Sequence, residues 1–107
     1  MTATMEELEK LDIRIATITG VRDHPNADKL LLLDVYFGEG DERQIVAGIK
    51  EDYEKSDLLH SQIPVVANME PIEIRGEQSN GMLLAVNGDE IALLNPDKIC
   101  EPGVPVE

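Results

Sequence analysis

The stretch NMEPIEIRGEQSNGMLL, residues 68–84, gathers side chains suited to anion recognition. Arg75 offers a planar fork of N–H donors that matches the oxygens of a phosphate. Ser79 adds a hydroxyl, and Asn68 adds an amide that can donate or accept a hydrogen bond. Together these groups predict a local phosphate-binding surface.

Two glycines and a methionine complete this stretch. Gly76 and Gly81 allow the backbone to approach a ligand closely, or to take turn conformations closed to other residues. Methionine commonly fills hydrophobic cores. For Met82, a position in the core is therefore the main alternative to contact with a ligand. The corresponding alternative for Asn68 is that its amide caps a turn.

Arg75 also has a purely structural alternative, because Glu73 and Glu77 are close enough in sequence to pair with it. Lys29 and Lys50 are candidates for secondary phosphate contacts. An isolated lysine is more often a solvated surface group. The sequence leaves these alternatives open.

His24 lies in Asp-His-Pro-Asn-Ala-Asp, residues 23–28, and raises the question of metal binding or acid–base chemistry. Proline and asparagine at a strand end are good turn formers, which favours a structural role. No second histidine lies nearby, and no nucleophile with a base occurs in a recognisable context. Cys100 lacks a CxxC partner and is interpreted as an inert thiol. We expect no catalytic residue, no metal site and no cofactor.

Charge limits the kind of nucleic-acid contact that this chain can make. It has 107 residues, the length of one domain, with 22 acidic and 9 basic residues and a formal net charge of -13. Such a field repels polyanions at low salt, and the cations form no basic run. Any phosphate contact must therefore be local. Two explanations of the acidic surface stay open. It keeps the protein soluble in a salt-rich cytoplasm, or it is a binding surface for a basic protein.

Composition also bears on location. No apolar run is long enough to span a membrane, and the N-terminus lacks the features of a signal peptide. One cysteine excludes an internal disulfide. These features predict a cytoplasmic protein without a membrane partner.

The apolar periodicity predicts mostly strands. Thr4 to Glu7 matches a capping box, which predicts a leading helix within residues 1–11. The Asn87-Gly88-Asp89 stretch predicts a hairpin between strands at 82–86 and 91–94. The remaining expectations are strands from residue 12, at 30–37, 44–49 and 63–69, a helix within 50–60, and an extended arm at 96–107.

This order of elements predicts an all-β fold, a five-stranded Greek-key barrel of the OB type, in a single domain covering residues 1–107. One short helix lies between strands 3 and 4. Single-strand binders of this fold use aromatic platforms, but the chain has only two tyrosines and one phenylalanine. Recognition of the shape and phosphates of folded RNA needs fewer aromatic side chains.

Four segments of the chain, in this order, carry a family pattern: DIRIATITGVRDHPNADKLLLLDVYFG, QIVAGIKEDY, VVANMEPIEIRGEQSNGMLLAV and IALLNPDKICEPGVPV. From about residue 11 to the C-terminus, the chain resembles the tRNA-binding domain of methionyl-tRNA synthetase. That domain occurs as a C-terminal appendage, as a separate beta subunit and as free tRNA-binding proteins. The resemblance implies an OB fold, homodimerisation through the terminal segments, binding of tRNA by shape, partnership with a methionyl-tRNA synthetase catalytic subunit, and no catalysis.

Within the third segment, the family pattern reads roughly Asn-Leu-Lys-Pro-x-Lys-Leu-Arg-Gly-x-x-Ser-x-Gly-Met. Glu70 and Glu73 stand where the pattern has lysine, and Ala47 stands where serine is frequent. A carboxylate in place of a lysine replaces phosphate attraction by repulsion. Two alternatives therefore stay open: an acidic protein-interaction or dimerisation module with weakened RNA binding, and a chaperone-like relative that binds exposed peptide. The matching positions are Asn68, Arg75, Gly76, Ser79, Gly81 and Met82.

Overall fold

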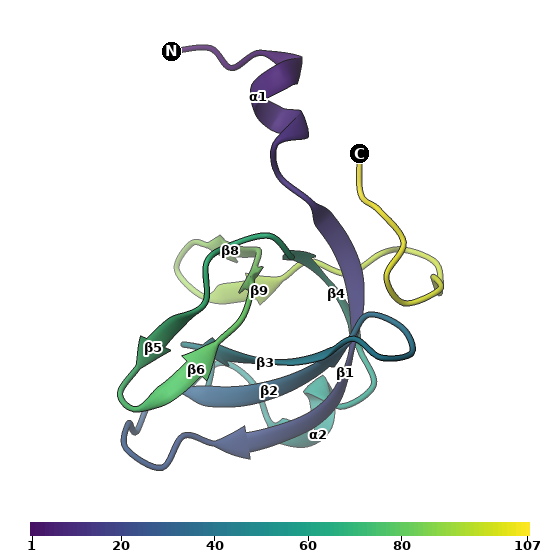
Figure 1. Ribbon diagram of the computed structural model, residues 1–107. Coiled ribbons are helices and arrows are strands. Elements are labelled where there is room, and N and C mark those ends of the chain that lie inside the picture. The colour runs from purple at the N-terminus through teal and green to yellow at the C-terminus, as the bar shows by residue number, and fades with distance from the viewer.

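A curled five-stranded antiparallel sheet forms the body of the protein in the computed structural model, which describes residues 1–107 (Figure 1). Its strand order is β3-β2-β1-β4-β7, and two small hairpins, β5-β6 and β8-β9, are attached to it. The predicted all-β class is confirmed, and the curled sheet is consistent with an OB-like barrel. The strands are β1 (Ile13–Asp23), β2 (Leu31–Tyr36), β3 (Glu42–Ala47), β4 (Gln62–Val66), β5 (Ile72–Ile74), β6 (Glu77–Ser79), β7 (Met82–Leu83), β8 (Ala85–Asn87) and β9 (Ile91–Leu93).

The long strand β1 serves two partners and curls the sheet. Its first part, Ile13 to Thr17, pairs with β4, and its second part, Thr17 to Asp23, pairs with β2. The register shifts between Ile18 and Gly20, an irregularity that bends and twists a strand. A Cβ at Gly20 would lie 2.5 Å from Oδ2 of Asp34 on β2. A larger residue here would therefore displace the Asp34 carboxylate, which pairs with Arg22.

The core inside the curled sheet is aliphatic, with Phe37 as its one buried aromatic. Helix α2 (Lys55–Leu58) contributes only Leu58. The predicted helix within residues 50–60 is thus limited to four residues, because the segment offers too few apolar anchors for a longer one. The buried cluster comprises Ala16, Ile18, Leu31, Leu33, Val35, Phe37, Ile45, Ala47, Ile49, Leu58, Ile63, Val65 and Ala67.

Helix α1 (Met5–Glu9) stands away from the sheet, and none of its residues is buried (Figure 1). The capping box is formed in full: Thr4 Oγ1 accepts from the Glu7 backbone N–H at 3.1 Å, and Thr4 N–H donates to Glu7 Oε1 at 3.0 Å. Local sequence signals therefore begin this helix without help from the barrel. No helix in the structure has the length and apolar character needed to cross a bilayer.

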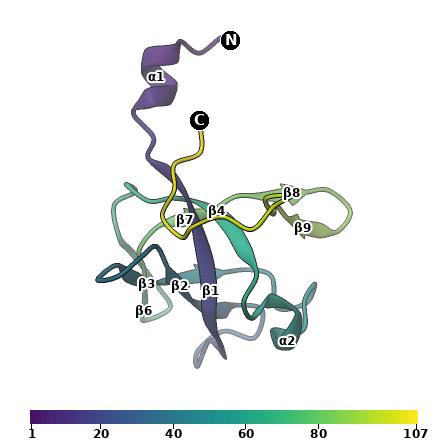
Figure 2. The ribbon, with the colours of Figure 1, turned by 90° about the vertical axis from the view of Figure 1, so that its right-hand side faces the viewer.

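The C-terminal arm, residues 96–107, is extended only in part: it bends at residues 97–98 and turns at residues 102–103, and its last part lies along the edge of β1 (Figure 2). Ile15 N–H donates to the Val104 carbonyl at 3.0 Å, and Gly103 N–H donates to the Ile15 carbonyl at 2.7 Å. The amide of Gln62 holds both backbone groups of Cys100, its N–H at 2.9 Å and its carbonyl at 2.7 Å. The arm therefore belongs to its own barrel and places its end beside α1.

A serine side chain joins β3 to β6. Ser79 Oγ accepts from the Val46 backbone N–H at 3.0 Å, and Asn80 N–H donates to the Gln44 carbonyl at 2.8 Å. Ser79 is only 5% exposed. Its hydroxyl thus replaces a backbone carbonyl where β3 and β6 meet.

Ser79→Ala should destabilise the fold, because the Val46 N–H would lose its acceptor in a buried position. We expect a loss of about 1–3 kcal/mol in the free energy of unfolding, measured by urea denaturation. Ser56→Ala is the matched control, since Ser56 is exposed on α2. Equal stability of the two variants would contradict this role for Ser79.

Candidate nucleic-acid interface

Arg75 and Gly76 form the turn of the β5-β6 hairpin. Ile74 pairs with Glu77, which leaves the two residues between them as the loop. Their φ angles are 54° for Arg75 and 90° for Gly76. Positive φ at both central positions is the pattern of a type I′ turn, which suits the twist of a hairpin. Glycine takes this conformation freely, whereas it is uncommon for arginine.

The loop between β1 and β2 holds this turn by hydrogen bonds. His24 Nε2 lies 2.9 Å from the Ile74 carbonyl oxygen, and Asn26 Nδ2 donates to the Arg75 carbonyl at 3.0 Å. Asn26 N–H also donates to His24 Nδ1 at 2.9 Å. His24 is buried, and both of its ring nitrogens are engaged by backbone groups. The first and third of the four segments that carry the resemblance are thus in direct contact.

Arg75 is exposed and forms no ion pair, so the structural alternative in which it pairs with Glu73 or Glu77 is wrong. Arg75 lies with Lys29 around a shallow depression of about 380 Å³, completed by Ala27, Asp28 and Leu30. The other three arginines pair with aspartates: Arg14 with Asp12, Arg22 with Asp34 and Arg43 with Asp41.

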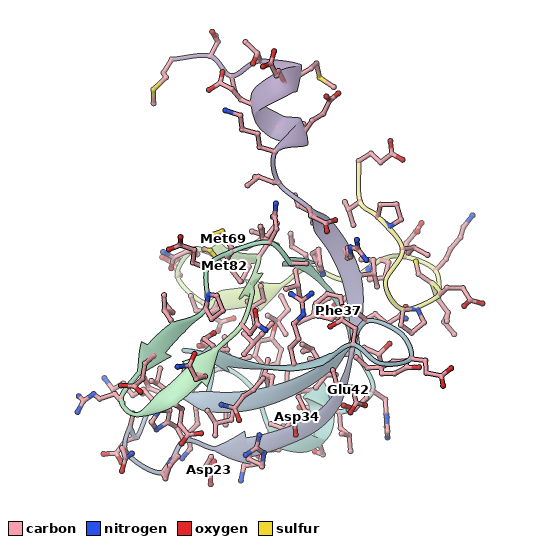
Figure 3. The ribbon with its side chains drawn as sticks, viewed as in Figure 1. Asp23, Asp34, Phe37, Glu42, Met69 and Met82 are labelled. Atoms are coloured by element: carbon pink, nitrogen blue, oxygen red, sulfur yellow. The ribbon has the colours of Figure 1, made fainter.

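The lysines near this end of the barrel are paired with carboxylates. Lys29 Nζ lies 3.8 Å from Glu51, a long contact between exposed groups. Lys50 Nζ is 3.2 Å and Lys55 Nζ 2.9 Å from the carboxylate of Asp23. Asp23 is the last residue of β1, at the end of the strand far from α1 (Figure 3).

These lysines lower the pKa of Asp23. Hydrogen bonds from Lys55 and then from Lys50 lower its pKa below the ordinary carboxyl value of 3.8. Sequence reasoning singled out Lys50 but missed Lys55. No local pattern marked Lys55, because only folding brings α2 next to the end of β1.

Asn68 does not form a simple turn cap. Its Oδ1 accepts from the Asp12 N–H at 2.8 Å, and its Nδ2 donates to the Lys10 carbonyl at 2.7 Å. The amide therefore fixes the linker between α1 and β1.

Met82 is not a core residue, contrary to the main alternative for it: its side chain is 53% exposed. It lies beside Met69 in an apolar groove of about 360 Å³ between the β5-β6 hairpin and the end of β3 (Figure 3). Because β7 is short and at the edge of the sheet, nothing covers this methionine. Glu70 also lines the groove, so a carboxylate adjoins an otherwise apolar surface.

The two glycines of the site are required by the fold. Gly76 completes the turn, and Gly81 has a φ of 125°. A Cβ on Gly81 would lie 3.1 Å from Val65 Cγ1 and 3.5 Å from Ile45 Cδ1. Gly76 therefore serves backbone conformation, and Gly81 serves both conformation and close packing next to the groove.

Comparison with known proteins identifies the family to which the chain belongs. Residues 13–105 match the tRNA binding domain family. The methionine–tRNA ligase of Pyrococcus furiosus is 47% identical over 104 residues, 96% of this chain and 14% of the ligase. That of Methanococcoides burtonii is 43% identical over 102 residues, 94% of this chain and 15% of the ligase. The chain thus spans only about a seventh of the length of these ligases.

Solved structures show the same fold. The CsaA chaperone protein of Picrophilus torridus superposes with a TM-score of 0.91 at 32% identity, covering 99% of this chain and all of that one. The MetRS related protein of Pyrococcus horikoshii superposes with a TM-score of 0.92 at 24% identity, covering 100% of this chain and 99% of that one. The family match over nearly the whole curled sheet, with the extensive identity to the ligases, leads to one conclusion: this chain belongs to the tRNA-binding domain family and is homologous to a region of methionyl-tRNA synthetases.

Proposed function

We propose that this chain is a non-catalytic module that binds tRNA by its shape and phosphates at the end of the barrel formed by loop 24–30 and the β5-β6 turn. The observation that carries the proposal is Arg75, the one arginine without an ion pair, presented beside Lys29. Barrels of the OB type bind ligands on the face of strands 2 and 3 and with the loops next to it. The family membership supports tRNA as the ligand.

The predicted site residues then have different tasks. Arg75 and Lys29 contact phosphate directly, and Lys50 contributes once phosphate competes with Asp23 for it. Met82 offers an apolar surface in the groove. Asn68, Gly76, Ser79 and Gly81 act through the backbone, because their polar atoms or their conformations are already used by the fold.

The proposed partner is a methionyl-tRNA synthetase catalytic unit. In the relatives, the homologous region is part of a much longer ligase. A bound or linked tRNA-binding module raises the local concentration of tRNA at the synthetase and so raises affinity without new chemistry. The proposal assigns no catalytic residue to this chain, and the cytoplasm as its location stays a prediction.

Arg75→Ala should weaken tRNA binding, because one charge-assisted contact and its released counterions are lost. We expect affinity to fall about tenfold, equal to about 1.4 kcal/mol. The salt dependence should also weaken: the slope of log K against log salt should become less steep by about the amount that one phosphate contact contributes. Fluorescence anisotropy of labelled tRNA, titrated from low salt to about 1 M, measures both.

Arg14→Ala is the matched control, since Arg14 pairs with Asp12 near the opposite end of β1. Equal losses in the two variants would show only a general charge effect. No binding by the folded wild-type protein at any salt would overturn the proposal. It would favour the alternative of an acidic protein-interaction module, which the exposed methionine groove beside Glu70 supports.

Asp23→Asn should strengthen tRNA binding at low salt, because it removes one carboxylate and releases Lys50 and Lys55. We expect a gain of about threefold that fades toward about 1 M salt, where screening shortens the reach of charges to about 3 Å. Asp89→Asn removes the same charge from the exposed β8-β9 turn without releasing a lysine. An equal gain in that control would show that only net charge matters.

Homodimerisation through the terminal segments is the second part of the proposal. Helix α1 leaves Met5 at 69% and Leu8 at 49% exposure, and it forms an apolar hollow of about 290 Å³ with Leu11, Ile13 and Val106. A five-residue helix has little stability alone. A second copy that covers this face would supply the packing it lacks.

Leu8→Asp should therefore convert a dimer to a monomer by placing a charge in the apolar contact. Sedimentation velocity across a concentration series measures the change. Leu59→Asp is the matched control, a leucine 39% exposed beside α2. A wild-type protein that sediments as a monomer at all concentrations would contradict the proposed dimer.

A further inference from the structure

The conformation of Arg75 is imposed from outside the hairpin. A positive φ is uncommon for a residue with a Cβ, and the usual residue at this position of a type I′ turn is asparagine, aspartate or glycine. The hairpin itself contributes only three residues to each strand. Something beyond local preference must hold Arg75 in this state.

The hydrogen bonds from loop 24–30 are placed to do so. The Ile74 carbonyl belongs to the peptide plane before the Arg75 Cα, and the Arg75 carbonyl belongs to the plane after it. His24 holds the first oxygen at 2.9 Å, and Asn26 holds the second at 3.0 Å. Because peptide units are planar, fixing both oxygens fixes φ and ψ of Arg75. The direction of its Cβ, from which the guanidinium starts, follows from these two angles.

The two holding residues are also linked to each other. Asn26 N–H donates to His24 Nδ1, so the ring accepts at Nδ1 and donates at Nε2 to the Ile74 carbonyl. This assignment requires a neutral imidazole with its proton on Nε2. His24 is only 5% exposed, which keeps water from competing for these bonds.

We propose that His24 and Asn26 are positioning residues for RNA binding: they hold the strained turn so that Arg75 is presented beside Lys29 before the ligand arrives. The inference rests on the proposed function and assigns these two residues a role in affinity. A side chain already held in its bound arrangement loses less conformational entropy on binding. The contribution of Arg75 therefore depends on a loop distant in sequence.

A double-mutant cycle tests the coupling between Asn26 and Arg75. Asn26→Ala removes the bond to the Arg75 carbonyl, and because Asn26 is exposed the core stays intact. We expect tRNA affinity to fall about three- to tenfold in the wild-type background, with an unchanged melting temperature. In the Arg75→Ala background, the same change should have little effect. Asn87→Ala, an exposed asparagine of the β8-β9 hairpin, is the matched control and should be neutral in both backgrounds.

The outcomes separate the two proposals. An equal loss from Asn26→Ala in both backgrounds would overturn the positioning role and leave the binding site standing. A neutral Asn26→Ala beside a weakened Arg75→Ala would do the same. A neutral Arg75→Ala would overturn the proposed site, and this inference with it.

His24 has its own test in the free protein. Long-range ¹H–¹⁵N spectra of the imidazole ring at neutral pH should show a proton on Nε2 and an unprotonated, hydrogen-bonded Nδ1. His24→Gln keeps a donor near the Nε2 position, so it should leave the amide signals of Arg75 and Gly76 closer to wild type than His24→Ala does. A ring with its proton on Nδ1 would overturn the role given to His24.

Discussion

The backbone pairing of β1 is the constraint on which the rest of the structure depends. One half of the strand pairs with β4 and the other with β2, so the strand must bend where its partners change. The glycine at that bend and the irregular register there let the sheet curl around an aliphatic core. Strand β2 does not pair with the start of β1, so the C-terminal arm forms hydrogen bonds with that edge of β1 instead. Both chain ends are thereby brought to one side of the barrel.

The same strand delivers the loop that organises the candidate site. Loop 24–30 follows β1 directly, and its histidine and asparagine reach the β5-β6 turn. Neither segment forms a site by itself. The loop supplies Lys29 but no arginine, and the hairpin has only three residues in each strand to hold Arg75 at a positive φ. Hydrogen bonds from the loop to backbone oxygens of the hairpin connect these two segments, both of which carry the family resemblance.

Ion pairing determines which basic side chains are free to bind a phosphate. The chain carries 9 basic residues against 22 acidic ones, and ion pairs engage most of the basic side chains. Exposed pairs of this kind contribute little to stability, and a phosphate can compete for the cation. Arg75 can bind a phosphate without first leaving a carboxylate, because it forms no ion pair. In a protein of net charge -13, one unpaired guanidinium beside a lysine is therefore more informative than the total charge.

The sequence by itself determined the class of elements and the family, because strand periodicity, the capping box at Thr4 and the Asn87-Gly88-Asp89 turn act over a few residues. It did not determine which site groups are free. Ser79 and Asn68 looked available for a ligand, yet their polar atoms bond to backbone 33 and 56 positions away. Met82 looked like core, yet it lies on a short edge strand and is exposed. Only the tertiary structure decided these points, because each depends on contacts between segments distant in the chain, which no local pattern encodes.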